Sequence, residues 1–295
     1  MMQLGGLMLM ATLSMACSTQ NNPMVVTAHR GASGIAPESS VFAYEEALKL
    51  PVDYLEGDVQ RTQDGHLVIF HDASLGADTD VELFFPHRRN QPIETFTWAE
   101  LSQLSSGKWF NITYKDKAQK RFDQARILRL EDLLEKLDPN TGPGLYLETK
   151  RAHAHPNIEI ELVALLKQYG WLPMAKTSGP PRVLVQSFEP ESLERFRVIA
   201  PDVPRVLLVV PMKVASLGRA GLISHAQAVD AYGVGVHSLS CTPWNVSAWH
   251  EAGLKIHVYT LNSSWQFYVV EKLGVDGIFT DHPQRLLEFL ERESL

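Results

Sequence analysis

From Met24 onward, short apolar runs alternate with stretches whose apolar residues recur at helical spacing. Six runs in the second half of the chain have the length of buried strands: 145–150, 183–187, 205–210, 233–237, 255–262 and 276–280. Helical patterns at 157–169, 189–199, 243–252 and 263–273 separate most of these runs, and 211–232 has room for another helix. Two earlier runs end at His29 and at Asp58, which brings the number of candidate strands to eight.

Eight strands with intervening helices predict an α/β fold, a (β/α)8 TIM barrel, for which a length of about 250 residues is typical. The competing architecture is a doubly wound open sheet. No glycine-rich nucleotide-binding fingerprint follows any of the strands, which argues against that alternative. We therefore expect one barrel domain over residues 23–295.

The count of eight depends on a hairpin at residues 54–72. Glu56 and Asp58 are two residues apart in an extended run, so their side chains leave the same face of a strand. Asp64 and Gly65 form a tight-turn signal, after which 66–70 returns as the second arm of the hairpin. This reversal places His71 beside the two carboxylates.

Residues 73–126 have no clear periodicity and are expected to form an irregular insertion with one short helix. A capping box, Thr97 with Glu100 three residues later, marks the start of that helix. Regular helices are expected on both sides of the insertion, at 39–50 and at 130–137. Serines precede the first of these and are suited to cap it.

The first 22 residues are expected to be a leader and linker outside the fold. The apolar run at 4–16 is too short to span a bilayer, which takes about 20 residues, and it ends in small residues before Cys17. This segment resembles a bacterial lipoprotein signal, which implies lipidation of Cys17, a membrane tether without a span, and a periplasmic or outer-membrane location. The alternative is an uncleaved or wrongly assigned start.

Composition narrows the classes of partner. The net charge of −7 over 295 residues argues against general nucleic-acid binding. An anionic substrate then needs local cations or a metal ion. The two cysteines, one of them in the leader, do not imply a disulfide framework.

In a TIM barrel, reactive residues gather at the carboxyl ends of the strands. The strand ends and the hairpin supply three acids, two histidines and two cations: Glu56, Asp58, Glu148, His29, His71, Arg30 and Lys150. Three carboxylates suit a hard divalent cation such as Mg²⁺ or Ca²⁺. Histidines suit acid–base catalysis near neutral pH, and an arginine with a lysine suits a phosphate group. The pattern predicts metal-assisted phosphoryl chemistry.

A set of ordered motifs covers nearly all of residues 24–290. The motifs are 29–33 (HRGAS) with 37–38 (PE), 56–59 (EGDV), 62–65 (TQDG), 70–72 (FHD), 147–150 (LETK), 186–188 (QSF), 258–262 (VYTLN) and 274–281 (GVDGIFTD). In this order they resemble the glycerophosphodiester phosphodiesterase family. That resemblance implies a TIM barrel that hydrolyses small-molecule glycerophosphodiesters to glycerol 3-phosphate and an alcohol, with Ca²⁺ or Mg²⁺ as cofactor.

Carried over position by position, the resemblance also implies a role for each site residue. The implied roles are metal binding by Glu56, Asp58 and Glu148, acid–base catalysis by His29 and His71, and phosphate contact by Arg30 and Lys150. The attacking oxygen is either water or a neighbouring hydroxyl of the substrate, and the motifs fit both.

Two departures and two alternative functions remain open. Ser39 and Ser40 replace the usual Asn-Thr, and Ala77 stands where the family usually has an arginine. The first alternative function is a lysophospholipase D-like phosphodiesterase that uses the 73–126 insertion as a lipid-facing lid. The second is a catalytically inactive binding protein on the same barrel.

Overall fold

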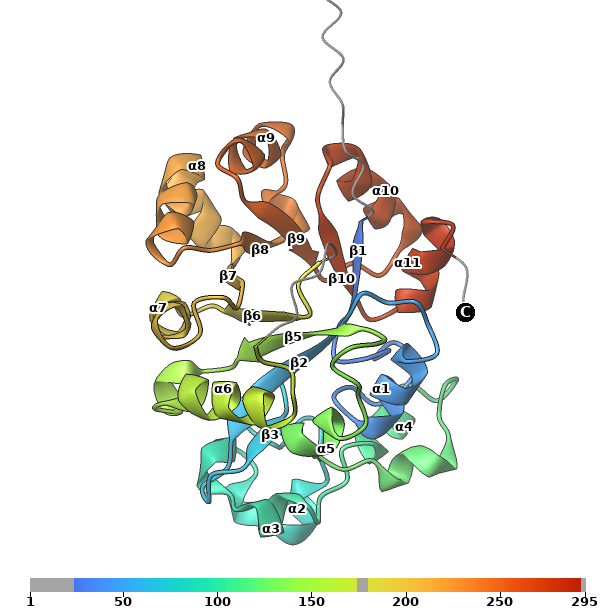
Figure 1. Cartoon of the computed structure of the whole chain (residues 1–295). Helices are drawn as coiled ribbons and strands as arrows, with labels where there is room; N and C mark the ends of the chain where they lie inside the picture. The colour runs from blue at the N-terminus through green and yellow to red at the C-terminus, as the bar shows by residue number, and fades with distance from the viewer. Residues whose placement is uncertain (1–23, 174–179, 293–295) are drawn as a thin grey trace, which may run out of the picture.

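A computed structural model describes residues 24–173 and 180–292. Its centre is a closed barrel of parallel strands (Figure 1), in which β1 pairs with both β2 and β10. The eight barrel strands are β1 (Val25–Ala28), β2 (Tyr54–Arg61), β5 (Gly144–Thr149), β6 (Val183–Ser187), β7 (Arg205–Val209), β8 (Gly233–His237), β9 (Lys255–Tyr259) and β10 (Gly277–Thr280). The predicted (β/α)8 TIM barrel is confirmed.

Helices surround the barrel (Figure 1): α1 (Val41–Ala47), α5 (Leu130–Leu134), α6 (Ile158–Gln168), α7 (Pro190–Ile199), α8 (Pro211–Ala228), α9 (Pro243–Glu251), α10 (Ser264–Leu273) and α11 (Pro283–Phe289). Short 3₁₀ turns follow two of the strands, η4 (Ala152–Ala154) after β5 and η5 (Ser238–Ser240) after β8. Ser40 caps α1 by accepting a hydrogen bond from the Ala43 amide, as expected. Helix α11 was not predicted.

The hairpin has the predicted form. Strand β3 (Leu67–Ile69) runs antiparallel to the end of β2, with Val59 opposite Ile69, and β4 (Leu128–Arg129) pairs with β3. Both short strands lie outside the closed barrel. The return arm is therefore not a ninth barrel strand, and it places His71 at the mouth of the barrel.

The insertion contains more helix than predicted. In place of one short helix it has α2 (Val81–Phe84), α3 (Trp98–Leu101), α4 (Lys108–Thr113) and the 3₁₀ turns η1 (Pro86–Arg88), η2 (Ile93–Thr95) and η3 (Lys120–Gln124). The capping box at α3 is confirmed, since Thr97 and Glu100 exchange both bonds. The other helices escaped prediction because helices of four to six residues are too short to repeat an apolar face. An apolar cluster packs the segment against the β3 hairpin: Val68, Phe70, Leu75, Val81, Ile93, Phe96, Leu101, Leu104 and Ile127.

The interior of the barrel changes character along the strands. A lower layer is apolar and buried: Tyr54, Tyr146, Leu184, Val206 and Phe279. Two residues further along three of these strands, on the same face, stand Glu56, Glu148 and Gln186. Aromatic side chains thus fill the barrel beneath a polar layer at its mouth. None of the helices in residues 24–173 and 180–292 combines the length and apolar character needed to cross a membrane.

Candidate active site

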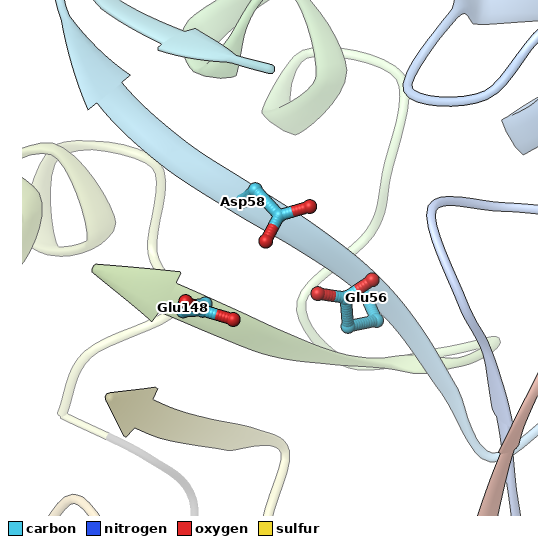
Figure 2. A group of neighbouring side chains, drawn as sticks. All are labelled: Glu56, Asp58 and Glu148. Carbon is cyan, nitrogen blue, oxygen red and sulfur yellow. The ribbon is translucent and has the colours of Figure 1, made fainter. Parts of the chain in front are cut away.

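Three buried carboxylates from two neighbouring strands converge at the mouth. Figure 2 shows Glu56 and Asp58 on β2 and Glu148 on the adjacent β5. Each offers an oxygen within 4.8 Å of the others, and each side chain is nearly inaccessible to solvent. The parallel pairing that sets Asp58 opposite Glu148 therefore builds the cluster predicted from the spacing.

Two cations lie against this cluster. Lys150 Nζ is 3.3 Å from Asp58 Oδ1 and 3.2 Å from Glu148 Oε1. Arg30 Nε is 3.3 Å from Asp58 Oδ2, and the Arg30 amide donates to Glu56 Oε2 at 2.8 Å. The Arg30 guanidinium also donates to both oxygens of Glu38 at 2.9 Å. Glu38 thus orients Arg30 toward the acids.

The three carboxylates differ in their preferred charge. Burial, followed by the charge of Asp58, raises the pKa of Glu148 to about 8 and the pKa of Glu56 well above its usual value. Burial would also raise the pKa of Asp58, but Lys150 and Arg30 outweigh it and hold that pKa below its ordinary range. Further positive charge at the cluster would therefore favour the ionised form of Glu56 and Glu148.

The donor set fits a hard divalent cation. Among the described residues, none donates a hydrogen bond to Gln186 Oε1, and Asp58 Oδ2 has the ion pair with Arg30 Nε but no hydrogen bond, although buried polar oxygens are normally satisfied. Carboxylate and amide oxygens are the ligands that Mg²⁺ and Ca²⁺ prefer. Glu56, Asp58 and Glu148 would hold such an ion.

Each histidine of the site has its Nδ1 bound to a carboxylate. His29, directly after β1, is 2.7 Å from Asp281 Oδ1, and His71 is 2.7 Å from Asp72 Oδ1. An ionised carboxylate only accepts hydrogen bonds, so each Nδ1 carries a proton and each Nε2 is left for the pocket. Burial lowers the pKa of His71, which favours its neutral form.

Asp281 is itself held by two other groups. Asn262 Nδ2 donates to its Oδ2 at 2.6 Å, and Ser33 Oγ donates to its Oδ1 at 3.1 Å. Burial alone would raise the pKa of Asp281, but these bonds and the bond from His29 bring it to about 2. Asp281 therefore remains ionised at neutral pH.

These groups surround one cavity of about 250 Å³. Its lining includes all seven residues that the sequence placed at the mouth: His29, Arg30, Glu56, Asp58, His71, Glu148 and Lys150. The lining also includes four largely apolar residues: Phe188, Leu208, Tyr259 and Phe279. The eighth predicted site residue, Cys17, lies outside the described residues.

The sequence did not assign roles to four residues that support the site. Asp281 and Asp72 bind the histidines, Glu38 binds Arg30, and Gln186 lines the cavity with its amide 3.4 Å from Glu56. All four belong to the motifs of the sequence. Asp281 directly follows β10, and Gln186 is the last residue but one of β6. For these two residues, position at the carboxyl end of a strand is a signal that the sequence offers.

Comparison with known proteins agrees with this geometry. The model of the "Glycerophosphoryl diester phosphodiesterase family" matches residues 29–285. A glycerophosphodiester phosphodiesterase of Bacillus subtilis is 32% identical over 288 residues, covering 96% of this chain and 93% of the relative. A probable glycerophosphodiester phosphodiesterase 1 of Mycobacterium tuberculosis is 32% identical over 276 residues, covering 92% and 93%.

Solved structures show the same similarity. A putative glycerophosphoryl diester phosphodiesterase from Silicibacter pomeroyi superposes with a TM-score of 0.76 at 27% identity, covering 91% of this chain and 94% of the other. An Oleispira antarctica phosphodiesterase, solved with the product sn-glycerol-3-phosphate, gives 0.75 at 26% identity, covering 90% and 96%. The chain belongs to the glycerophosphoryl diester phosphodiesterase family.

Proposed function

We propose that this enzyme hydrolyses glycerophosphodiesters to glycerol 3-phosphate and an alcohol, with a divalent cation and two catalytic histidines. The observation that carries the proposal is the convergence of His29 and His71, each held at Nδ1 by a carboxylate, on the pocket of the three buried acids. The related Oleispira antarctica enzyme, solved with sn-glycerol-3-phosphate, supports the choice of product.

The substrate phosphate would lie between the cations and the acids. Arg30 and Lys150 present N–H donors at the mouth of the pocket, where they suit the non-bridging phosphate oxygens. Glu56, Asp58 and Glu148 would hold Mg²⁺ or Ca²⁺, which when bound neutralises negative charge on the phosphoryl oxygens.

The histidines would move the protons. One neutral imidazole accepts a proton at Nε2 from the attacking oxygen, which then bonds to phosphorus. The other, protonated, donates from Nε2 to the alcohol oxygen as its bond to phosphorus breaks. Asp281 and Asp72 fix the rings so that both Nε2 atoms serve the pocket. The same assignment serves attack by water and attack by a neighbouring substrate hydroxyl.

The metal requirement is tested by measuring release of choline and glycerol 3-phosphate from glycerophosphocholine with and without a chelator. We expect the chelator to stop the reaction and Mg²⁺ or Ca²⁺ to restore it. Full activity in the presence of the chelator would contradict the metal assignment. Absence of hydrolysis under saturating metal would instead favour an inactive binding protein.

The histidine roles are tested by His29→Ala and His71→Ala, each of which should abolish turnover while leaving the fold intact. The matched control is His153→Ala. His153 also has its Nδ1 on a carboxylate, that of Glu189 at 2.8 Å, but its side chain is 70% exposed and does not line the pocket. Near wild-type turnover by either site variant would contradict the acid–base assignment.

We also propose that the protein is exported and tethered to a membrane through lipidated Cys17. Val25 begins β1 and His29 follows the end of that strand, so the chain enters the barrel on the face opposite the mouth. The seven residues between Cys17 and Val25 span at most about 25 Å. An anchored enzyme would hold its mouth away from the membrane. Mass spectrometry of the mature N-terminus tests this, and an unlipidated start would contradict it.

A further inference from the structure

A second, larger cavity adjoins the catalytic pocket. It measures about 580 Å³ against about 250 Å³ for the pocket itself. It lies between the end of β7, the start of α7 and helix α8, on a different side of the mouth from the insertion helices α2 and α3 (Figure 1). Its lining is mostly apolar: Phe188, Pro190, Leu207, Leu208, Val209, Val210 and Leu217, with Glu191, Lys213 and His225.

Two residues line both cavities, Phe188 and Leu208. The Phe188 ring is 5.9 Å from Lys150 Nζ and 6.0 Å from the Tyr259 ring, and 40% of the residue is exposed. The border is therefore a partly exposed apolar side chain directly beside the proposed phosphate ligand Lys150. A substituent on a phosphodiester bound there would reach the second cavity.

Helix α8 is shaped around this cavity. Its path breaks at Gly218, which has φ of +63° and separates an initial segment, 211–217, from the remainder. Lys213 and Leu217 line the cavity from the first segment, and His225 lines it from the second. Both segments of α8 therefore border the cavity, together with β7 and the start of α7.

Exposed apolar residues continue from the cavity to the surface. Val210, directly before α8, is 47% exposed, and Leu239 is 79% exposed in η5, which contacts α8. Apolar groups gathered on a surface next to an active site are typical of ligand-binding grooves. The area beside the catalytic pocket therefore suits a long apolar ligand better than a polar headgroup.

We propose that the 580 Å³ cavity is a subsite for a single alkyl or acyl chain, so that the preferred substrates are glycerophosphodiesters that carry one chain, the lysophospholipids. This inference rests on the proposed function. In the net reaction, an oxygen of water bonds to phosphorus, the bond from phosphorus to the headgroup alcohol breaks, and a proton from that water passes to the alcohol. The chain remains on the glycerol phosphate. The lipid-binding element is then the β6–β8 side of the mouth and not the 73–126 insertion.

The test compares glycerophosphocholine with 1-acyl-glycerophosphocholines whose acyl chains grow from two to ten carbons, all below their micelle-forming concentrations. Choline release measures every member of the series in the same way. Each buried methylene should raise kcat/KM by about fourfold until the chain fills the cavity. Choline release at equal or falling kcat/KM along the series overturns the subsite, whereas no choline release from any substrate overturns the proposed function itself.

Two variants in the first segment of α8 test whether the dependence of kcat/KM on chain length arises in the cavity. Leu217→Gln places an amide in the cavity and should flatten the dependence of kcat/KM on chain length. Met212→Gln, at a residue outside the cavity lining, is the matched control and should keep the wild-type dependence. Circular dichroism of both variants checks that α8 is intact. Equal slopes for the two folded variants would overturn the placement of the chain.

Discussion

The carboxylate of Asp281 provides the sharpest test of how this site works. Asp281 directly follows β10 and receives hydrogen bonds from His29 Nδ1, Asn262 Nδ2 and Ser33 Oγ. Asp281→Asn keeps the shape of the side chain but removes its charge. An asparagine can present its NH₂ group to His29, which then no longer has to carry its proton on Nδ1. We expect turnover to fall because the Nε2 atom of His29 is no longer reliably available to the substrate.

The size of the loss can be bounded from the structure. After the opposing effect of burial, the contacts of Asp281 lower its pKa from 3.8 to about 2. This pKa difference of about 1.8 corresponds to about 2.4 kcal/mol in favour of the ionised carboxylate over the protonated acid. If all of this free energy serves to orient His29 in the transition state, its loss lowers kcat by about 60-fold. If half does, the fall is about eightfold. KM should change little, since Asp281 does not line the pocket.

The control lies at the other end of the same strand. Asp276, directly before β10, accepts from His250 Nε2 at 2.8 Å and from Lys255 Nζ at 2.8 Å. Asp276→Asn removes an aspartate–histidine contact of the same kind far from the pocket, so it should lower stability and leave kcat per folded molecule unchanged. Steady-state kinetics with glycerophosphocholine, corrected for the folded fraction, separates the two variants. Wild-type kcat in folded Asp281→Asn would refute the positioning role.

Three further predictions concern metal, pH and backbone. Glu148→Gln should weaken Mg²⁺ or Ca²⁺ binding at least about tenfold, seen by calorimetry, and wild-type affinity would exclude Glu148 as a ligand. Burial lowers the pKa of His257 from 6.5 to about 4, so only the unfolded chain binds this proton between those values. The free energy of unfolding therefore decreases as the pH falls below 6.5, by about 2 kcal/mol at pH 5. Urea unfolding should show a smaller decrease for His257→Gln. Gly31→Ala should destabilise by more than Gly65→Ala in thermal unfolding. Both glycines have positive φ, but a Cβ at Gly31 would lie 2.6 Å from the Ala43 carbonyl carbon, whereas a Cβ at Gly65 would have none of the described neighbouring atoms within 4 Å. Equal losses of stability in the two variants would refute the steric argument.

The barrel and its acids were predictable because both depend on local periodicity. A strand alternates its two faces, so Glu56 and Asp58 had to share a side of β2. The parallel order of the strands then brought Glu148 to the same end. The hairpin was predictable because Asp64 and Gly65 specify a tight turn between two extended runs.

The supporting residues depend on contacts that no local pattern encodes. Asp281 and His29 are 252 positions apart and meet only because β10 closes the barrel against β1. The break at Gly218 and the cavity beside it likewise depend on the packing of α8 against β7 and β8. Spacing in the sequence shows which side chains share a face, but it does not show which partner lies opposite.

The layering of the barrel links the stability of the protein to its chemistry. The aromatic layer around Tyr54 and Tyr146 removes water from beneath Glu56, Asp58 and Glu148, and buried like charges oppose each other strongly. Arg30 and Lys150 compensate Asp58, whereas burial and the charge of Asp58 raise the pKa of Glu56 and of Glu148. A divalent cation would stabilise the folded state by ionising them together. Metal binding and the free energy of unfolding should therefore change together, through the same carboxylates that form the proposed catalytic centre.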